Sequence, residues 1–123
     1  MTEWRKWLGD RGEQVAESYV KREGFRIVDR NVRTRFGEMD LIAMDGDTLV
    51  FCEVRSRGGG SLDEAAESIG VRKQQRLIHL AQVYLQKHPE LADCPCRFDA
   101  ILLQKKGKTW LVERIADAFR PGW

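Results

Sequence analysis

The chain of 123 residues has few cysteines, few prolines and no long apolar segment. Its three cysteines are an odd number and too few for a disulfide framework, so we expect a protein of the reducing cytoplasm. No apolar run approaches the roughly 18–20 residues that cross a bilayer. The first residues also lack the apolar segment of a secretory signal. These absences argue against a disulfide scaffold and against a membrane protein.

Excess charge of one sign is also missing. Lys and Arg number 21 and Asp and Glu 19, so the net charge of +2 is far below that of many DNA-binding modules. The distribution is uneven, because residues 21–35 carry six basic and two acidic side chains, whereas residues 38–67 carry two basic and eight acidic ones. This pattern fits a phosphate-binding rim beside a metal pocket, although charge alone favours an ordinary solvated surface.

The hydrophobic periodicity predicts a single α/β domain over residues 1–123. Gly24 follows the first helical pattern at the position of a helix-ending glycine, and His88-Pro89 ends the second. Two apolar runs flank Asp45-Gly46, which is a strong hairpin signal. The element order is therefore α-β-β-β-α-β-β, a mixed central sheet flanked by helices. The expected ranges are helices over about 4–23 and 70–87, and strands over 25–32, 38–44, 47–55, 97–103 and 109–115.

Three carboxylates, those of Glu38, Asp40 and Glu53, lie within or beside this apolar hairpin sequence. A buried sheet normally excludes charge, because an unpaired carboxylate away from water is costly. A two-residue turn at Asp45-Gly46 would set Glu38 opposite Glu53, with Asp40 diagonal to Glu53 on the same face. Repulsion among these groups would be relieved by a divalent cation, and carboxylate oxygens suit Mg²⁺ or Mn²⁺.

This metal site depends on the register of the hairpin. A three-residue turn over residues 45–47 would send Asp40 and Glu53 to opposite faces of the sheet. The alternative without a metal is that the carboxylates lie at solvated strand ends or pair with arginines. Spacing alone leaves both readings open.

Asp40, followed thirteen residues later by Glu53-Val54-Arg55, resembles the D…(D/E)-x-K signature of the PD-(D/E)XK, or restriction-endonuclease-like, superfamily. An ordered series of further segments resembles the YraN-type family of small bacterial proteins, related to archaeal Holliday-junction resolvases. The resemblance runs from about residue 8 to 119, and the series is far more specific than the short signature. The segments are Gly12–Ala16, Asp29–Asn31, Gly37–Ala43, Val50–Arg57, Arg72–Lys73 and Arg97–Asp99.

The resemblance implies a restriction-endonuclease-like core in which Asp40 and Glu53 ligate Mg²⁺ (or Mn²⁺). Glu13 matches an additional acidic residue of resolvase-like members, and would complete the metal shell or hold a metal-bound water. The alternative for Glu13 is an exposed carboxylate in the early turns of a helix, where the macrodipole favours it. Because related resolvases act as dimers, the resemblance also implies a homodimer.

Arg55 stands where the superfamily has a lysine. An arginine effectively keeps its proton, so it cannot act as a base, although its fork of donors can hold a phosphate or a water. Three further cations are candidates for contacts with nucleic acid: Arg57 in the glycine-rich segment after the signature, and Arg72 and Lys73 at the start of the second helix. For each of them an ordinary solvated surface is the alternative.

The sequence thus leaves three functions to weigh. The first is a metal-dependent endonuclease that hydrolyses phosphodiester bonds in DNA, with branched or damaged DNA as the substrate that the resemblance implies. The second is a nucleic-acid-binding module that keeps the fold without catalysis, with Arg55 as a phosphate clamp. The third is an interaction protein of a DNA-processing assembly. The first predicts that Asp40→Asn and Glu53→Gln abolish cleavage while the fold survives.

Overall fold

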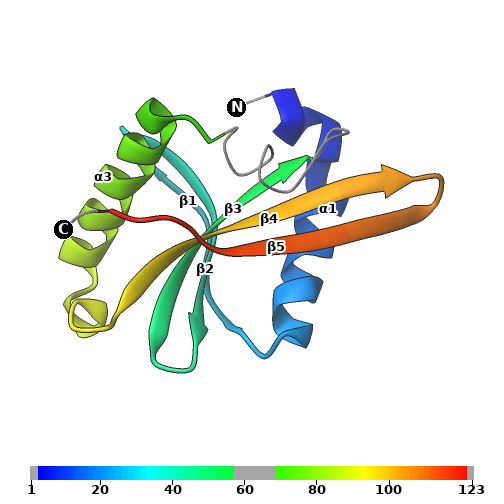
Figure 1. Ribbon diagram of the computed structural model, residues 1–123. Helices are drawn as coiled ribbons and strands as arrows, with labels where there is room; N and C mark the ends of the chain where they lie inside the picture. The colour runs from blue at the N-terminus through cyan, green and yellow to red at the C-terminus, as the bar shows by residue number, and fades with distance from the viewer. Residues whose placement is uncertain (1–2, 57–68, 122–123) are drawn as a thin grey trace.

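The computed structural model describes residues 3–56 and 69–121, with only the backbone described for residues 3–10. Its elements follow the expected order α-β-β-β-α-β-β (Figure 1). A single turn of 3-10 helix, η1, follows the second long helix. None of the helices in the described ranges is long and apolar enough to cross a membrane. The elements are α1 (Glu3–Arg22), β1 (Arg26–Thr34), β2 (Gly37–Asp45), β3 (Thr48–Ser56), α3 (Val71–Lys87), η1 (Pro89–Leu91), β4 (Cys96–Lys106) and β5 (Thr109–Phe119).

The five strands form one mixed sheet in the order β1-β2-β3-β4-β5. Neighbouring strands are antiparallel except β3 and β4, which are parallel. A parallel pair needs a crossover connection, and α3 lies in the segment that joins these two strands. The predicted α/β class and element order are therefore confirmed.

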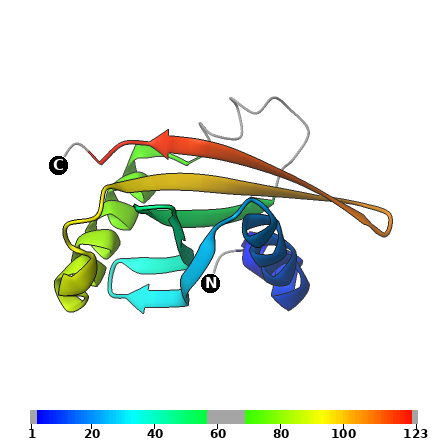
Figure 2. The same cartoon turned by 90° about the horizontal axis from the view of Figure 1, so that it is seen from below.

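The two long helices cover opposite faces of the sheet, as the alternation along β3 shows. Leu49 and Phe51 belong to the cluster that contains the buried side chains of α3. Val50 and Cys52 belong to the cluster that contains Ala16 of α1. Successive strand residues point to opposite faces, so β3 contributes to both halves of the core. Figure 2 shows α1 and α3 well apart, with β4 and β5 running across both.

The hairpin between β2 and β3 turns one residue later than expected. Asp45 pairs with Thr48, so Gly46 and Asp47 form the two-residue turn. Gly46 has a φ of 60°, which suits the turn types that join twisted hairpin strands. The expected turn at Asp45-Gly46 is wrong, and so is the pairing of Glu38 with Glu53 that followed from it. The three-residue turn is also excluded.

The last two strands are longer than the sequence pattern indicated, and β5 continues past an irregularity. The register of β4 with β5 shifts between Phe98 and Ala100. Asp117 lies in the displaced part of β5 with a φ of 54°, and its backbone N–H donates to the buried Asp99 carboxylate at 2.9 Å. A side chain thus satisfies the backbone where the ladder is interrupted, and pairing resumes at Phe119.

Candidate metal and phosphate site

Asp40 and Glu53 lie where the ladder between β2 and β3 stops. The last pair in that direction is Leu41 with Cys52, and the next residue on each strand is an acid. Beyond this point the Oδ2 atom of Asp40 accepts a hydrogen bond from the Val54 N–H at 2.8 Å. The Asp40 carboxylate therefore lies beside the peptide bond that follows Glu53.

Both carboxylates are almost fully buried, with 3% of Asp40 and 2% of Glu53 exposed. The diagonal relation expected from the Asp45-Gly46 turn does not hold, because each acid is the residue next to the last observed pair, Leu41 with Cys52. Two neighbouring acids are thus brought to one end of the strand pair. Burial makes their charge expensive, so this end of the sheet favours cations.

Lys73 approaches the site from α3. Its Nζ atom lies 2.9 Å from Oε1 of Glu53, and the lysine side chain is 30% exposed. Lys73 is the third residue of α3, in a first turn that contains no acidic residue. A cation there opposes the helix macrodipole, so the carboxylate of Glu53 offsets an otherwise unfavourable placement. The structure therefore places Lys73, predicted only as a surface phosphate contact, against a buried acid.

Glu13 belongs to α1, which covers the other face of the sheet from α3. Its half-buried side chain lines a pocket together with Glu17, Arg30, Asn31 and Asp40. The volume of this pocket is about 20 Å³, which is room for one water molecule. The structure thus brings Glu13 and Asp40 to one small polar space.

The second acid of this pocket, Glu17, was not anticipated from the sequence. Arg30 Nε donates to its Oε2 at 2.9 Å, and Lys21 Nζ lies 3.1 Å from its Oε1. Hydrogen bonding to Arg30, reinforced by Lys21, lowers the pKa of Glu17 to about 2 despite its partial burial. Glu17 is therefore held ionised by two cations, and the only hint in the sequence is its i, i+4 spacing from Glu13 and Lys21.

The other candidate residues are distributed around this site. Arg55 is half-buried on β3, two residues after Glu53 and hence on the same side of the strand. Arg72 is exposed beside Lys73. Glu38 does not join Asp40 and Glu53 as expected, since Arg33 Nε binds its Oε1 at 2.7 Å across β1 and β2. Arg57 lies outside the described residues.

A model of the uncharacterised protein family UPF0102 matches residues 12–103, a span that contains all of these carboxylates. The chain belongs to this family. It is 41% identical over 118 residues to a UPF0102 protein of Magnetococcus marinus, covering 96% of this chain and 95% of that one. A UPF0102 protein of Methylobacillus flagellatus is 46% identical over 114 residues, with 93% and 97% covered. One of Pelotomaculum thermopropionicum is 43% identical over 121 residues, with 97% and 100% covered.

In this UPF0102 chain the carboxylate oxygens of Asp40 and Glu53 are of the donor type that a hard divalent cation prefers. Within the described ranges no group of three or more His, Cys, Asp and Glu side chains is arranged to hold a metal. Mg²⁺, however, is usually held by one or two carboxylates and completes its shell with waters and substrate phosphates. Asp40 and Glu53 supply two carboxylates, which is the number that such magnesium sites commonly contain.

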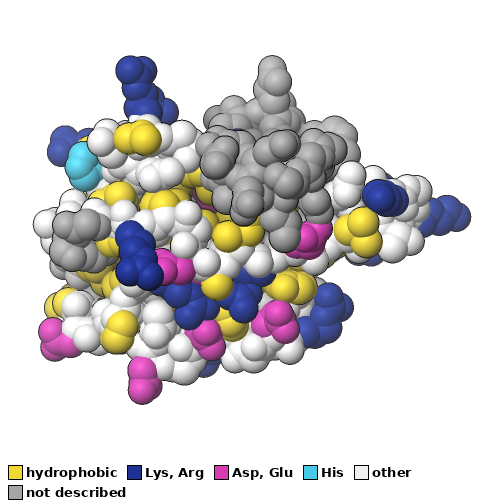
Figure 3. Space-filling model, viewed as in Figure 1, with side chains coloured by type: hydrophobic (Ala, Val, Ile, Leu, Met, Phe, Trp, Pro, Cys, Tyr) yellow, Lys and Arg dark blue, Asp and Glu magenta, His cyan; other side chains and the backbone are white. Residues whose placement is uncertain are grey.

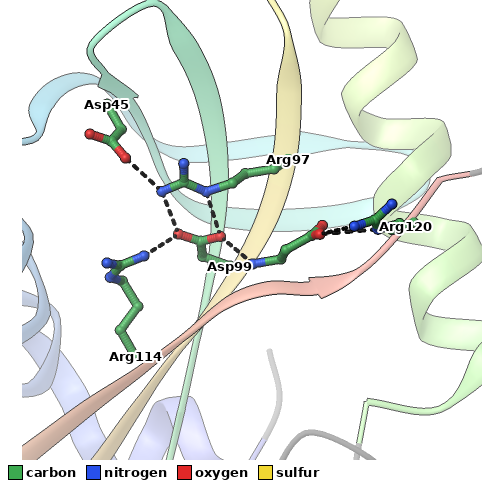
Figure 4. Close-up of polar contacts among 6 residues, drawn as sticks. Asp45, Arg97, Asp99, Arg114 and Arg120 are labelled. Carbon is green, nitrogen blue, oxygen red and sulfur yellow. Dashed lines mark hydrogen bonds and ion pairs between the residues drawn. The ribbon is translucent and has the colours of Figure 1, made fainter.

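A second acidic centre of this UPF0102 chain lies on β4 and was given no role from the sequence. Asp99 is 1% exposed, and its two oxygens accept hydrogen bonds from Arg97 at 2.9 and 3.1 Å and from Arg114 at 3.0 Å (Figure 4). Arg97 also donates to Asp45 at the end of β2, at 2.9 Å. With Asp117 N–H as a further donor, Asp99 links β4 to β5, and its partner Arg97 extends the link to β2. The sequence around Asp99, between Phe98 and Ala100, did not indicate which side chains would contact its carboxylate.

Proposed function

We propose that this protein is a metal-dependent endonuclease of the PD-(D/E)XK superfamily that hydrolyses phosphodiester bonds in DNA. The observation that carries the proposal is a pair of buried acids at one end of the β2–β3 ladder, one of which is paired with a lysine. Asp40 and Glu53 each follow the last pair of the β2–β3 ladder, and the Lys73 ammonium lies 2.9 Å from Glu53. The α/β architecture, with a sheet between two helices, is compatible with a restriction-endonuclease-like core.

Asp40 and Glu53 are the residues that would hold Mg²⁺ or Mn²⁺. Such an ion supplies a Lewis acid for the phosphoryl oxygen and lowers the pKa of a bound water. Glu13 lines the same pocket as Asp40, where it would hold a water in place. The burial of Asp40 and Glu53 keeps their charge away from bulk water, which strengthens their attraction for a cation.

The cations of the site suit a phosphate. Lys73 is 30% exposed and so can reach from Glu53 toward a ligand at the surface. Arg55 has a planar fork of donors that matches phosphate oxygens. Arg72 adds an exposed positive charge beside them. We assign to these residues the binding and orientation of the scissile phosphate, and to none of them the role of a base.

One observation favours a second candidate, a nucleic-acid-binding module without catalysis. The ammonium of Lys73 neutralises Glu53 in the way that a metal ion would. A buried carboxylate that is already paired with a lysine gains less stabilisation from binding a divalent cation. In this alternative Arg55 and Lys73 clamp phosphate, and the acids only position them.

A cleavage assay decides between the two. Purified protein is incubated with Mn²⁺ or Mg²⁺ and with single-stranded, duplex, flap and four-way-junction DNA, with EDTA as the blank. Asp40→Asn and Glu53→Gln are purified identically, and Glu90→Gln, an exposed acid on η1, is the matched control. The nuclease predicts metal-dependent cleavage by the wild type and the control, lost in both site variants.

The contrary result is equally clear. If folded wild-type protein cleaves no substrate and yet binds DNA in a salt-dependent manner, the binding module replaces the nuclease. In that case Asp40→Asn and Glu53→Gln leave binding intact or tighten it, because negative charge near phosphate is removed. Absence of both cleavage and salt-sensitive binding would contradict both candidates and leave an interaction protein.

A further inference from the structure

A second basic feature lies on the other edge of α1, outside the carboxylate site. A cleft of about 340 Å³ runs between this helix and the start of β5. The α1 residues that line it recur at helical spacing, so they form one stripe along the helix. The cleft is lined by Arg11, Gln14, Val15, Ser18, Arg22, Trp110 and Val112.

The charge of the cleft is positive. Arg11 and Arg22 are exposed, and within the described part of the chain no carboxylate forms an ion pair with either of them. They are eleven residues apart on one helix, which is roughly 16 Å along its axis. Two cations at that separation match an extended phosphate backbone better than a single small anion.

The β4–β5 hairpin extends the same charge. Figures 1 and 2 show this hairpin projecting beyond α1, and Figure 3 shows dark blue side chains at that end of the molecule. The exposed lysines there are Lys105, Lys106 and Lys108. Lys105 pairs across the strands with Trp110, and its Nζ lies 5.6 Å from the centre of the indole ring. The cleft thus combines cations with one half-buried aromatic wall.

We propose that this cleft binds a single strand of DNA that flanks the cleavage point. The inference deepens the proposed nuclease function and rests on it for the choice of DNA. A positively charged groove with an aromatic side chain on which a base can stack is the usual arrangement for single strands. The cleft and the Glu13–Asp40 pocket lie on different edges of α1, because they are lined by different residues of that helix. The cleft therefore binds nucleotides that flank the scissile phosphate and does not bind that phosphate itself.

The test measures binding in EDTA, where cleavage plays no part. A fluorescently labelled 20-nucleotide oligo-dT, its RNA counterpart oligo-U and a duplex of equal length are titrated at several salt concentrations. The cleft variant is Arg11→Ala with Arg22→Ala. The matched control, Arg26→Ala with Lys87→Ala, removes the same charge from exposed positions on β1 and α3 that do not line the cleft.

We expect the cleft variant to lose at least fivefold in affinity for oligo-dT, whereas the control loses less than twofold. Loss of two phosphate contacts also lowers the slope of log K against log salt by about 1.4. Wild-type affinity in the folded cleft variant, a preference of the wild type for the duplex, or tighter binding of oligo-U would each overturn the proposal. Absence of cleavage by the wild type, or cleavage retained by Asp40→Asn, would overturn the nuclease in a separate assay, so failure of the cleft and failure of the nuclease are distinguishable.

Discussion

The Nζ atom of Lys73 lies 2.9 Å from Oε1 of Glu53, so a lysine of α3 is paired with a carboxylate that is 97% shielded from solvent. The two partners are unequal, because the lysine keeps 30% of its side chain exposed. Removing one partner of a buried pair leaves the other charge uncompensated, and the penalty depends on how well water can reach what remains. This inequality has a measurable consequence for stability.

Lys73→Gln is expected to lower the free energy of unfolding by about 1–3 kcal/mol, because Glu53 then loses a cation in a buried place. Glu53→Gln is expected to cost less, since water can solvate the remaining lysine. Urea unfolding of both variants at pH 7 measures the difference. Equal losses, or a larger loss in Glu53→Gln, would contradict this description of the pair.

The pair of Glu17 with Arg30 predicts an effect of acid. The pKa of Glu17 is lowered from 4.5 to about 2 in the folded protein by Arg30. The stabilisation is therefore complete above pH 4.5 and is lost as the pH falls toward 2. Glu17→Gln is expected to cost about 1–2 kcal/mol at pH 7, reduced from the full linkage value because Arg30 is half exposed. The cost should vanish near pH 2.

Urea midpoints from pH 7 to pH 2 test this prediction, with Asp93→Asn as an exposed acidic control. The wild type should lose stability more steeply than Glu17→Gln below pH 4.5, while the control follows the wild type. Parallel curves for all three proteins would show that the ion pair contributes nothing measurable.

The sequence predicted the element order because apolar spacing and turn signals are local. It placed the hairpin turn wrongly by one residue, since Asp45, Gly46 and Asp47 are all good turn formers. The choice among them is made by contacts far along the chain: Asp45 is drawn into the end of β2, where Arg97 of β4 binds its carboxylate. Shifting the turn by one residue changes the register by two, so Asp40 rather than Glu38 is the β2 residue that follows the last pair, as Glu53 is on β3. The side chain of Asp40 lines the pocket beside α1, whereas that of Glu53 pairs with Lys73 of α3.

The contact between Lys73 and Glu53 was beyond the reach of the sequence for the same reason. It joins residues twenty positions apart through the packing of α3 on the sheet. The cation that pairs with Glu53 thus belongs to α3, whereas the sequence motif indicated Arg55 on β3.

Asp99 gives a prediction about the fold alone. Asp99→Asn removes a buried negative charge that accepts hydrogen bonds from Arg97 and Arg114, and should lower the free energy of unfolding by about 2–4 kcal/mol. Asp117→Asn is the control, because asparagine tolerates the φ of 54° at that position. It should cost less than about 1 kcal/mol, since the backbone N–H that Asp99 accepts is retained. Similar losses in the two variants would contradict the central place of Asp99.

Lys73 and Arg55 are the two candidates for the cation that binds the scissile phosphate. Lys73→Gln is expected to lower the cleavage rate by about a hundredfold to a thousandfold, as for loss of one electrostatic contact in the transition state. Lys73→Arg should recover part of the rate, because it restores the charge beside Glu53. Arg55→Lys, which restores the motif lysine, should change the rate by less than about threefold.

Arg76→Gln is the control for this series, since Arg76 is an exposed cation on the same helix. Rates are measured at saturating Mn²⁺ and at a temperature where circular dichroism shows every variant folded. A similar loss in Arg76→Gln would show that only the overall charge of α3 matters. An unchanged rate in Lys73→Gln, together with a large change in Arg55→Lys, would assign the phosphate to Arg55 and leave Lys73 as a stabilising partner of Glu53.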